Sequence, residues 1–145
     1  MNTLDLNNIL YDNPVTKRFF LGTYPACIVP ETNRKFYTFI TNTDNHTKSG
    51  EHWNAWVVDN DNVTFFDSYG RNPYLLNYHS VLNNFRQIRY TSECIQDFSS
   101  QACGLFCIHF LYNMTLKLPI SEFFCDYTNN LHYNDRVVLS IVDSI

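Results

Sequence analysis

Two strand-like runs on either side of a strong turn signal constrain this chain most. Residues 53–58 and 63–66 are rich in β-branched and aromatic side chains, and Asp59-Asn60-Asp61-Asn62 lies between them. We therefore expect a β-hairpin. If its turn centres between Asn60 and Asp61, Asn54 lies opposite Asp67 and His52 shares the face of Asn54. An imidazole and a carboxylate then meet at the open end of the hairpin, whereas a one-residue slip would place them on opposite faces.

The rest of the pattern predicts an α+β fold with a central mixed or antiparallel-rich sheet packed by helices. Further strands are expected over residues 35–41 and 87–90. Helices are expected over residues 3–10, 74–85, 102–116 and 135–145, with Thr3 and Asn134 as the N-caps of the first and last. No repeat or composition break divides the chain, so residues 1–145 are expected to form a single domain.

Composition excludes several classes of protein. Apolar residues make up 45% of the 145 residues, which is enough for a core. The net charge is −4, and the 10 Lys and Arg residues are scattered, which argues against a surface for nucleic acid. The five cysteines lack paired spacing, so no disulfide framework is expected. We expect no secretion signal and no transmembrane helix, since the N-terminus lacks basic and apolar regions and apolar runs are short.

Cys103 is the candidate nucleophile. It opens an apolar stretch with helical character, and a thiol at a helix N-terminus faces unpaired N–H groups and the positive end of the helix dipole. Both favour the thiolate, which is the nucleophilic form. His52 would serve as its base and Asp67 would orient and stabilise the imidazole.

Two further residues complete a candidate catalytic set. The side-chain amide of Gln96 and the backbone N–H of Cys103 can stabilise an oxyanion. Gly104 would let a substrate backbone pass close to the helix start, and Trp53 is expected at the substrate cleft beside His52, although a core tryptophan would look the same in sequence. Taken singly, each of these residues is more often structural than functional. The order and spacing of the set favour a cysteine hydrolase, most simply a peptidase.

A metal site is an alternative role for the cysteines near Cys103. Cys94, Cys103, Cys107 and His109 could be imagined as a zinc site, but no Cys-x-x-Cys pair is present and two cysteines one helical turn apart are an unusual structural pair. We expect no metal. Cys107 should lie deeper on the face of the helix that carries Cys103 and belong to the core.

Several sequence blocks resemble the adenovirus protease family (adenain, the C5 cysteine peptidases), within the wider group of SUMO- and ubiquitin-like-protein proteases. Phe20-Leu-Gly-Thr-Tyr24 is similar to an N-terminal block of that family, and Gly50-Glu-His-Trp-Asn-Ala-Trp56 to the block around its catalytic His. Phe66-Asp-Ser-Tyr-Gly70 is similar to Phe-Glu-Pro-Phe-Gly, and Ala102-Cys-Gly-Leu-Phe-Cys107 to the nucleophile block. Gln96 precedes Cys103 by seven residues, as the oxyanion glutamine of the family does.

The resemblance implies His52 as base, Asp67 in the place of a Glu, Gln96 as oxyanion donor and Cys103 as nucleophile. It also implies a papain-like fold with a permuted catalytic order, and cleavage of viral precursor proteins at Gly-containing sites during virion maturation. The enzyme would be a monomer in the virion and the host cell interior. The shorter, acidic chain suggests a divergent virus or a virus-derived mobile element.

Adenain uses two activators, DNA and a viral peptide bound through a disulfide. This chain is acidic, and Phe85 stands where the peptide-binding cysteine of adenain would align. We therefore expect no cofactor and do not carry DNA or peptide activation over.

Two other functions stay open. The same catalytic residues would serve a deubiquitinase or deSUMOylase acting on host ubiquitin-like modifiers, because those substrates also present a Gly-containing strand. A catalytically silent homologue that binds a capsid or host partner is the third possibility, against which the complete catalytic set argues.

Overall fold

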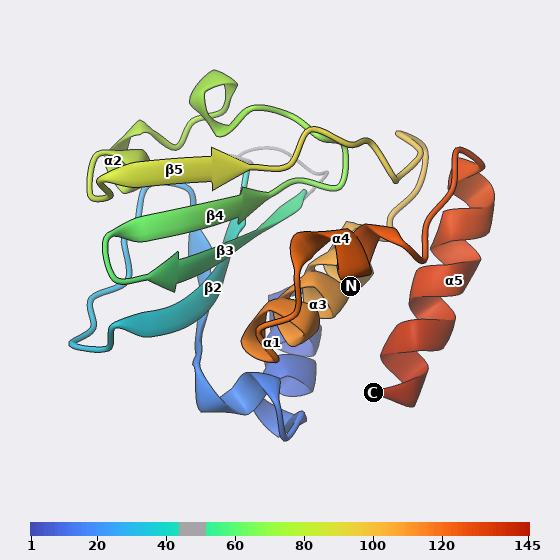
Figure 1. Ribbon diagram of the computed structural model, residues 1–145, viewed down its shortest axis with the longest axis horizontal. Helices are drawn as coiled ribbons and strands as arrows, with labels where there is room; N and C mark the ends of the chain where they lie inside the picture. Colours follow the sequence, from blue (N-terminus) through green and yellow to red (C-terminus); the bar gives the residue numbers. More distant parts are fainter. Residues whose placement is uncertain (44–51) are drawn as a thin grey trace.

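The computed structural model describes residues 1–43 and 52–145, and within them a five-stranded mixed sheet forms the centre of the fold (Figure 1). The strand order is β1-β2-β3-β4-β5. The two central pairings are antiparallel and the two outer ones are parallel. The strands are β1 (Phe20–Pro25), β2 (Phe36–Asn42), β3 (Trp53–Asp59), β4 (Asn62–Phe66) and β5 (Gln87–Tyr90).

The predicted hairpin forms in the predicted register. Ala55 pairs with Phe66 and Asp59 with Asn62, so continuing the ladder by one residue sets Asn54 opposite Asp67. Asn60 occupies the left-handed region at φ 57° in the tight turn, a conformation that asparagine tolerates better than most residues. This register places the end of β4 beside the start of β3, where the candidate site lies.

Helices cover one face of the sheet. Figure 1 shows α1 (Thr3–Asp12) and α3 (Cys103–Thr115) beside the sheet and α5 (Leu131–Ser144) on the far side of α3. α3 packs on β3 and α5 packs on α3. The side chains that fill this layer include Leu6, Ala55 and Phe106, all fully buried. The predicted α+β fold, with a central sheet packed by helices, is confirmed.

The other face of the sheet carries a second, aromatic core. Trp56 stacks on Phe39 with ring centroids 5.6 Å apart and meets Tyr78 edge to face at 5.1 Å. The Tyr78 hydroxyl donates to Oδ1 of Asn54 at 2.6 Å and accepts from Thr41 at 2.9 Å. A buried phenol satisfied in this way ties the segment after β4 to the middle of the sheet.

That tie explains a wrong prediction. Residues 74–85 were expected to form one helix, but only a 3-10 turn (Pro73–Leu75) and the short α2 (His79–Leu82) are present. Tyr78, Val81 and Leu82 are buried as the helical spacing required, whereas Leu75 is 82% exposed. The hydrogen bonds that hold Tyr78 against the sheet determine the conformation of this segment and override its helix propensity.

Helix starts also differ from the predictions. The side chain of Asn2, not Thr3, caps α1, in a capping box with Asp5. α5 begins four residues earlier than expected and is capped by Asn130, while Asn134 is fully buried and donates to the carbonyl oxygen of Ile95 at 3.0 Å. β1 and the short α4 (Ile120–Phe124) were not predicted.

In the part of the chain that the structure describes, no helix is long and apolar enough to cross a bilayer.

Candidate active site

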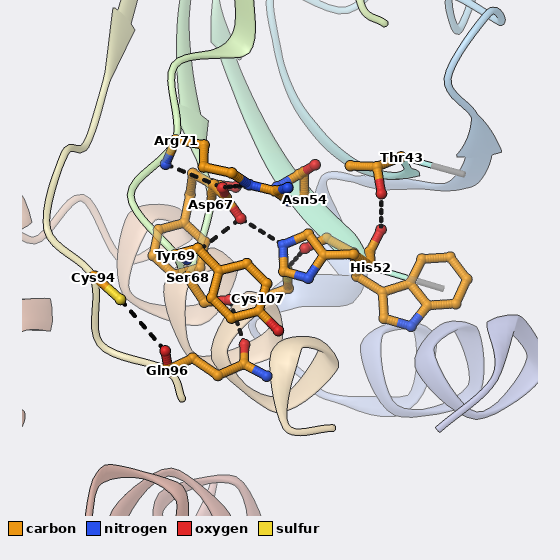
Figure 2. A network of polar contacts seen from close by, with 12 residues as sticks. Thr43, His52, Asn54, Asp67, Ser68, Tyr69, Arg71, Cys94, Gln96 and Cys107 are labelled. Carbon is orange, nitrogen blue, oxygen red and sulfur yellow. Dashed lines mark hydrogen bonds and ion pairs between the residues drawn. The ribbon is translucent and has the colours of Figure 1, made fainter. Parts of the chain in front are cut away.

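His52 and Asp67 form the centre of the candidate site, as the hairpin register predicts. Nε2 of His52 lies 2.5 Å from Oδ1 of Asp67 (Figure 2). His52 directly precedes β3 and Asp67 directly follows β4, so the antiparallel pairing itself brings the two side chains together. The Asp67 side chain is fully buried and that of His52 is 10% exposed. The ion pair is thus shielded from water, and its Coulombic attraction is stronger in this buried position than it would be in solvent.

Arg71 holds the second oxygen of the carboxylate. Its Nε lies 2.7 Å from Oδ2 of Asp67, and its backbone N–H donates to the same atom at 3.1 Å. Burial acts to raise the pKa of Asp67, but hydrogen bonds from His52 and Arg71 and their positive charges outweigh burial and lower it. The carboxylate therefore stays ionised beside the imidazole.

The imidazole of His52 favours its protonated form. Burial acts to lower the pKa of His52, while the hydrogen bonds to Asp67 and Cys103, with the charges of both groups, raise it; the result is a pKa above the ordinary value. Because Nε2 contacts Asp67, Nδ1 is the nitrogen left for Cys103. The histidine is thus placed between a carboxylate and a thiol, as a base that exchanges a proton with a cysteine requires.

Cys103 is the first residue of α3 and is 5% exposed. No side chain caps this helix at Ala102, so the positive end of its dipole is directed at the thiol without a competing acceptor from a cap. One turn further on, the buried Cys107 contacts the backbone carbonyl of Trp53 through its sulfur at 3.3 Å. Cys107 therefore belongs to the core, as predicted, and helps to fix α3 against β3.

Gln96 reaches the site from the loop between β5 and α3. Its side chain is fully buried, with Oε1 2.5 Å from the hydroxyl of Ser68 and Nε2 donating to the carbonyl of Ser100 at 3.1 Å. Ser68 neighbours Asp67, so the acid and the residue that contacts Gln96 follow one another at the end of β4. The structure thus brings His52, Asp67, Gln96 and Cys103 to one end of the central strands.

Trp53 and Gly104 were expected to line the substrate cleft. Trp53 is 2% exposed and belongs to the core between sheet and helices. A Cβ on Gly104 would lie 2.8 Å from the sulfur of Met1 and 3.2 Å from Leu6, so the missing side chain admits the N-terminal segment instead of leaving open space. These contacts give both residues a packing role, and their contact with a substrate stays a prediction.

Four residues of the site were missed as functional candidates: Ser68, Tyr69, Arg71 and Phe98. Tyr69 stacks on His52 with ring centroids 4.5 Å apart. The guanidinium of Arg71 lies over the Tyr69 ring, 5.2 Å from its centroid. Phe98, 76% exposed, stacks on Tyr69 at 4.6 Å. Ser68 and Tyr69 directly follow Asp67 in the block Phe66-Asp-Ser-Tyr-Gly70. Their position directly after the acid was the available signal, but Gln96 and Phe98, which contact Ser68 and Tyr69 respectively, lie in the distant loop between β5 and α3.

Within residues 1–43 and 52–145, no cluster of three or more His, Cys, Asp or Glu side chains could hold a metal ion. All five cysteines lie in these ranges and none is joined in a disulfide. Gly50 and Glu51, which belong to the block around His52, lie outside the described residues.

Comparison with known proteins places the fold among proteases. No protein-family model and no curated protein sequence matches this chain. The structure is similar to the crystal structure of the ASFV pS273R protease, with a TM-score of 0.60 and 14% identity, over 94% of this chain. This chain spans 65% of the length of that protease. The fold is therefore shared with the ASFV protease, although few residues are identical.

Two further solved structures were found. A Se-Met form of the same ASFV protease gives a TM-score of 0.46 at 19% identity, covering 72% of this chain and 43% of that one. The SUMO protease Ulp1, with its catalytic cysteine oxidised to a sulfenic acid, gives a TM-score of 0.37 at 15% identity, covering 74% and 53%.

Proposed function

We propose that this chain is a cysteine endopeptidase with Cys103 as nucleophile, His52 as acid and base, Asp67 as orienting acid and Gln96 as oxyanion donor. The observation that carries the proposal is the placement of His52 between Asp67, at 2.5 Å, and the thiol of Cys103. A buried base that contacts both an acid and a thiol at a helix start is the arrangement that nucleophilic catalysis by cysteine needs.

The proposed reaction has two halves. His52 takes the thiol proton of Cys103, and the sulfur attacks the carbonyl carbon of the scissile peptide bond. The negative charge that develops on the oxygen is stabilised by the Gln96 amide and the Cys103 N–H. His52 then gives its proton to the departing amine as the C–N bond breaks, which leaves a thioester. A water molecule, deprotonated by His52, hydrolyses the thioester, and the proton returns to the thiolate.

The substrate class is proposed from the resemblance of the sequence blocks to adenain, supported by the fold shared with the ASFV protease. In this proposal the chain is a divergent viral relative of adenain, acting on precursor proteins at Gly-containing sites as a monomer, inside the infected cell or the virion. It requires no metal, DNA or peptide activator.

Cleavage of a proteome-derived peptide library, followed by mass spectrometry of the new termini, tests the activity. The wild-type chain should cut at Gly-containing sites. Cys103→Ala should lower the rate by about a thousandfold or more, because the nucleophile and its base act as one unit. Cys125→Ser, which changes an exposed cysteine, is the matched control and should keep wild-type cleavage.

Two results would redirect the proposal. Undiminished cleavage by Cys103→Ala would remove Cys103 from the mechanism. Covalent labelling of Cys103 by a SUMO or ubiquitin vinyl sulfone, in a chain that leaves the peptide library uncut, would instead assign an isopeptidase.

A further inference from the structure

Beyond the residues of the proposed mechanism, Ser68 stands out by its contacts with Gln96. We propose that Ser68 is a positioning residue that fixes which end of the Gln96 side-chain amide is presented to the oxyanion. This inference rests on the proposed function, because an oxyanion forms only if the site attacks a carbonyl group.

Ser68 contacts Gln96 and its neighbour through both its side chain and its backbone. Its hydroxyl donates to Oε1 of Gln96 at 2.5 Å, and its carbonyl accepts from the N–H groups of Ile95 at 2.9 Å and Gln96 at 3.3 Å. Ser68 and Gln96 are both fully buried. The loop that carries Gln96 is therefore attached directly to the residue that follows Asp67 (Figure 2).

The need for such a residue follows from the shape of a glutamine amide. Its two ends are almost equal in size, but Nε2 carries two donors and Oε1 only accepts. Only the NH2 end stabilises an oxyanion, whereas an amide turned by half a rotation would set a carbonyl oxygen against the negative charge. Pre-set donors are what makes an oxyanion site effective, since they need no reorganisation during the reaction.

Two contacts specify the productive orientation. A donated proton from Ser68 requires an acceptor, so Oε1 faces Ser68. Nε2 faces Ser100, whose carbonyl accepts at 3.1 Å and uses one of the two amide protons. The hydroxyl of Ser100 lies 3.4 Å from the same Nε2, so a substrate oxyanion would replace this longer contact as the acceptor of the second amide proton. Without the Ser68 hydroxyl, Oε1 would be a buried acceptor that has lost its donor, and only the contacts of Nε2 with Ser100 would oppose rotation of the amide.

The test compares Ser68→Ala, Gln96→Ala and the double variant, using a peptide that the wild-type chain cleaves. Ser68→Ala should lower kcat about tenfold to a hundredfold with KM within about twofold, because the oxyanion exists only beyond the ground state. In the Gln96→Ala background, Ser68→Ala should change kcat by less than about twofold. Ser121→Ala, an exposed serine of α4, is the matched control and should keep wild-type kinetics.

A second readout separates positioning from general damage to the site. Alkylation of Cys103 by iodoacetamide is a direct displacement by sulfur and forms no oxyanion. Its rate, followed by mass spectrometry of the Cys103 peptide, should therefore match the wild-type rate in Ser68→Ala. Ser68→Gly, which also removes the hydroxyl but leaves no methyl group beside Oε1, should give the same pattern and serves if the alanine variant does not fold.

Three outcomes would overturn the inference: wild-type kcat in both Ser68 variants, equal losses in kcat and alkylation, or a full further loss of kcat in the Gln96→Ala background. Absence of peptide cleavage by the wild-type chain is a different result, which removes the proposed function and the oxyanion together.

Discussion

The charge state of His52 is set by opposing influences on one buried ring. Burial favours the neutral imidazole, and the contacts with Asp67 and Cys103 favour the cation and prevail. Because the pKa of His52 is raised on folding, its contribution to stability is complete below about pH 6.5 and is lost as the pH rises through the raised pKa. Asp67, with a lowered pKa, contributes stability above about pH 3.9, which is lost as the pH falls through that lowered value.

Asp67→Asn tests this account. Removal of the carboxylate charge should lower the pKa of His52, because burial then meets less opposition, and should lower kcat/KM by about a hundredfold or more. The first effect is measured by NMR titration of labelled histidine and the second by peptide cleavage. Asp12→Asn, a change in an exposed carboxylate of α1, should move neither. A His52 titration that is the same in Asp67→Asn and the wild-type chain would contradict the account.

At the scale of elements, sequence patterns predicted what is local and missed what depends on distant partners. The β3–β4 hairpin and the pairing of His52 with Asp67 follow from turn residues and side-chain alternation within a short segment. α3 follows from a long apolar run. By contrast, the conformation of residues 74–85 depends on the hydrogen bond from Tyr78 to Asn54 in the sheet. The orientation of the Gln96 side chain depends on a hydrogen bond from Ser68, 28 residues earlier. No local pattern encodes such contacts.

Asn134 shows how one element supports the site from a distance. The Nδ2 atom of this buried residue of α5 donates to the carbonyls of Ile95 and Thr128, and its Oδ1 accepts from the N–H of Thr128 at 2.8 Å. Asn134→Ala should lower the free energy of unfolding by about 2–3 kcal/mol, since it leaves buried backbone groups unsatisfied. Urea denaturation measures the loss.

The N-cap variant Asn130→Ala provides the comparison for Asn134→Ala. It removes a cap from the same helix and should cost only about 1 kcal/mol. Equal losses from the two variants would show that Asn134 acts through α5 alone and does not support the loop before Gln96.

At the scale of the whole molecule, an aromatic cluster joins sheet and helices. Phe66 at the end of β4 stacks on Phe110 of α3 at 4.5 Å, and Phe123 of α4 meets both rings edge to face, at 5.1 and 5.2 Å. All three rings are fully buried. The residue before Asp67 is thus held by the same helix that begins at Cys103, so Asp67 and Cys103 share one rigid support.

Phe123→Ala should lower the free energy of unfolding by about 3–5 kcal/mol, because it leaves a cavity where three elements meet. Thermal or urea unfolding measures the loss. Leu75→Ala, at an 82% exposed position, should stay within about 0.5 kcal/mol of the wild-type chain. A loss below about 1 kcal/mol for Phe123→Ala would mean that the surrounding side chains collapse into the space.

The separation of the proposed catalytic residues along the chain has a consequence for the order of folding. His52 and Asp67 belong to one hairpin, and contacts between residues close in sequence form with a small loss of chain entropy. Cys103 reaches them only after a much longer loop closes and α3 docks on β3. We therefore expect His52 and Asp67 to pair before Cys103 reaches them. A growing or half-folded polypeptide would then hold a paired histidine with no thiol beside it, and the proposed cleavage could not begin during synthesis.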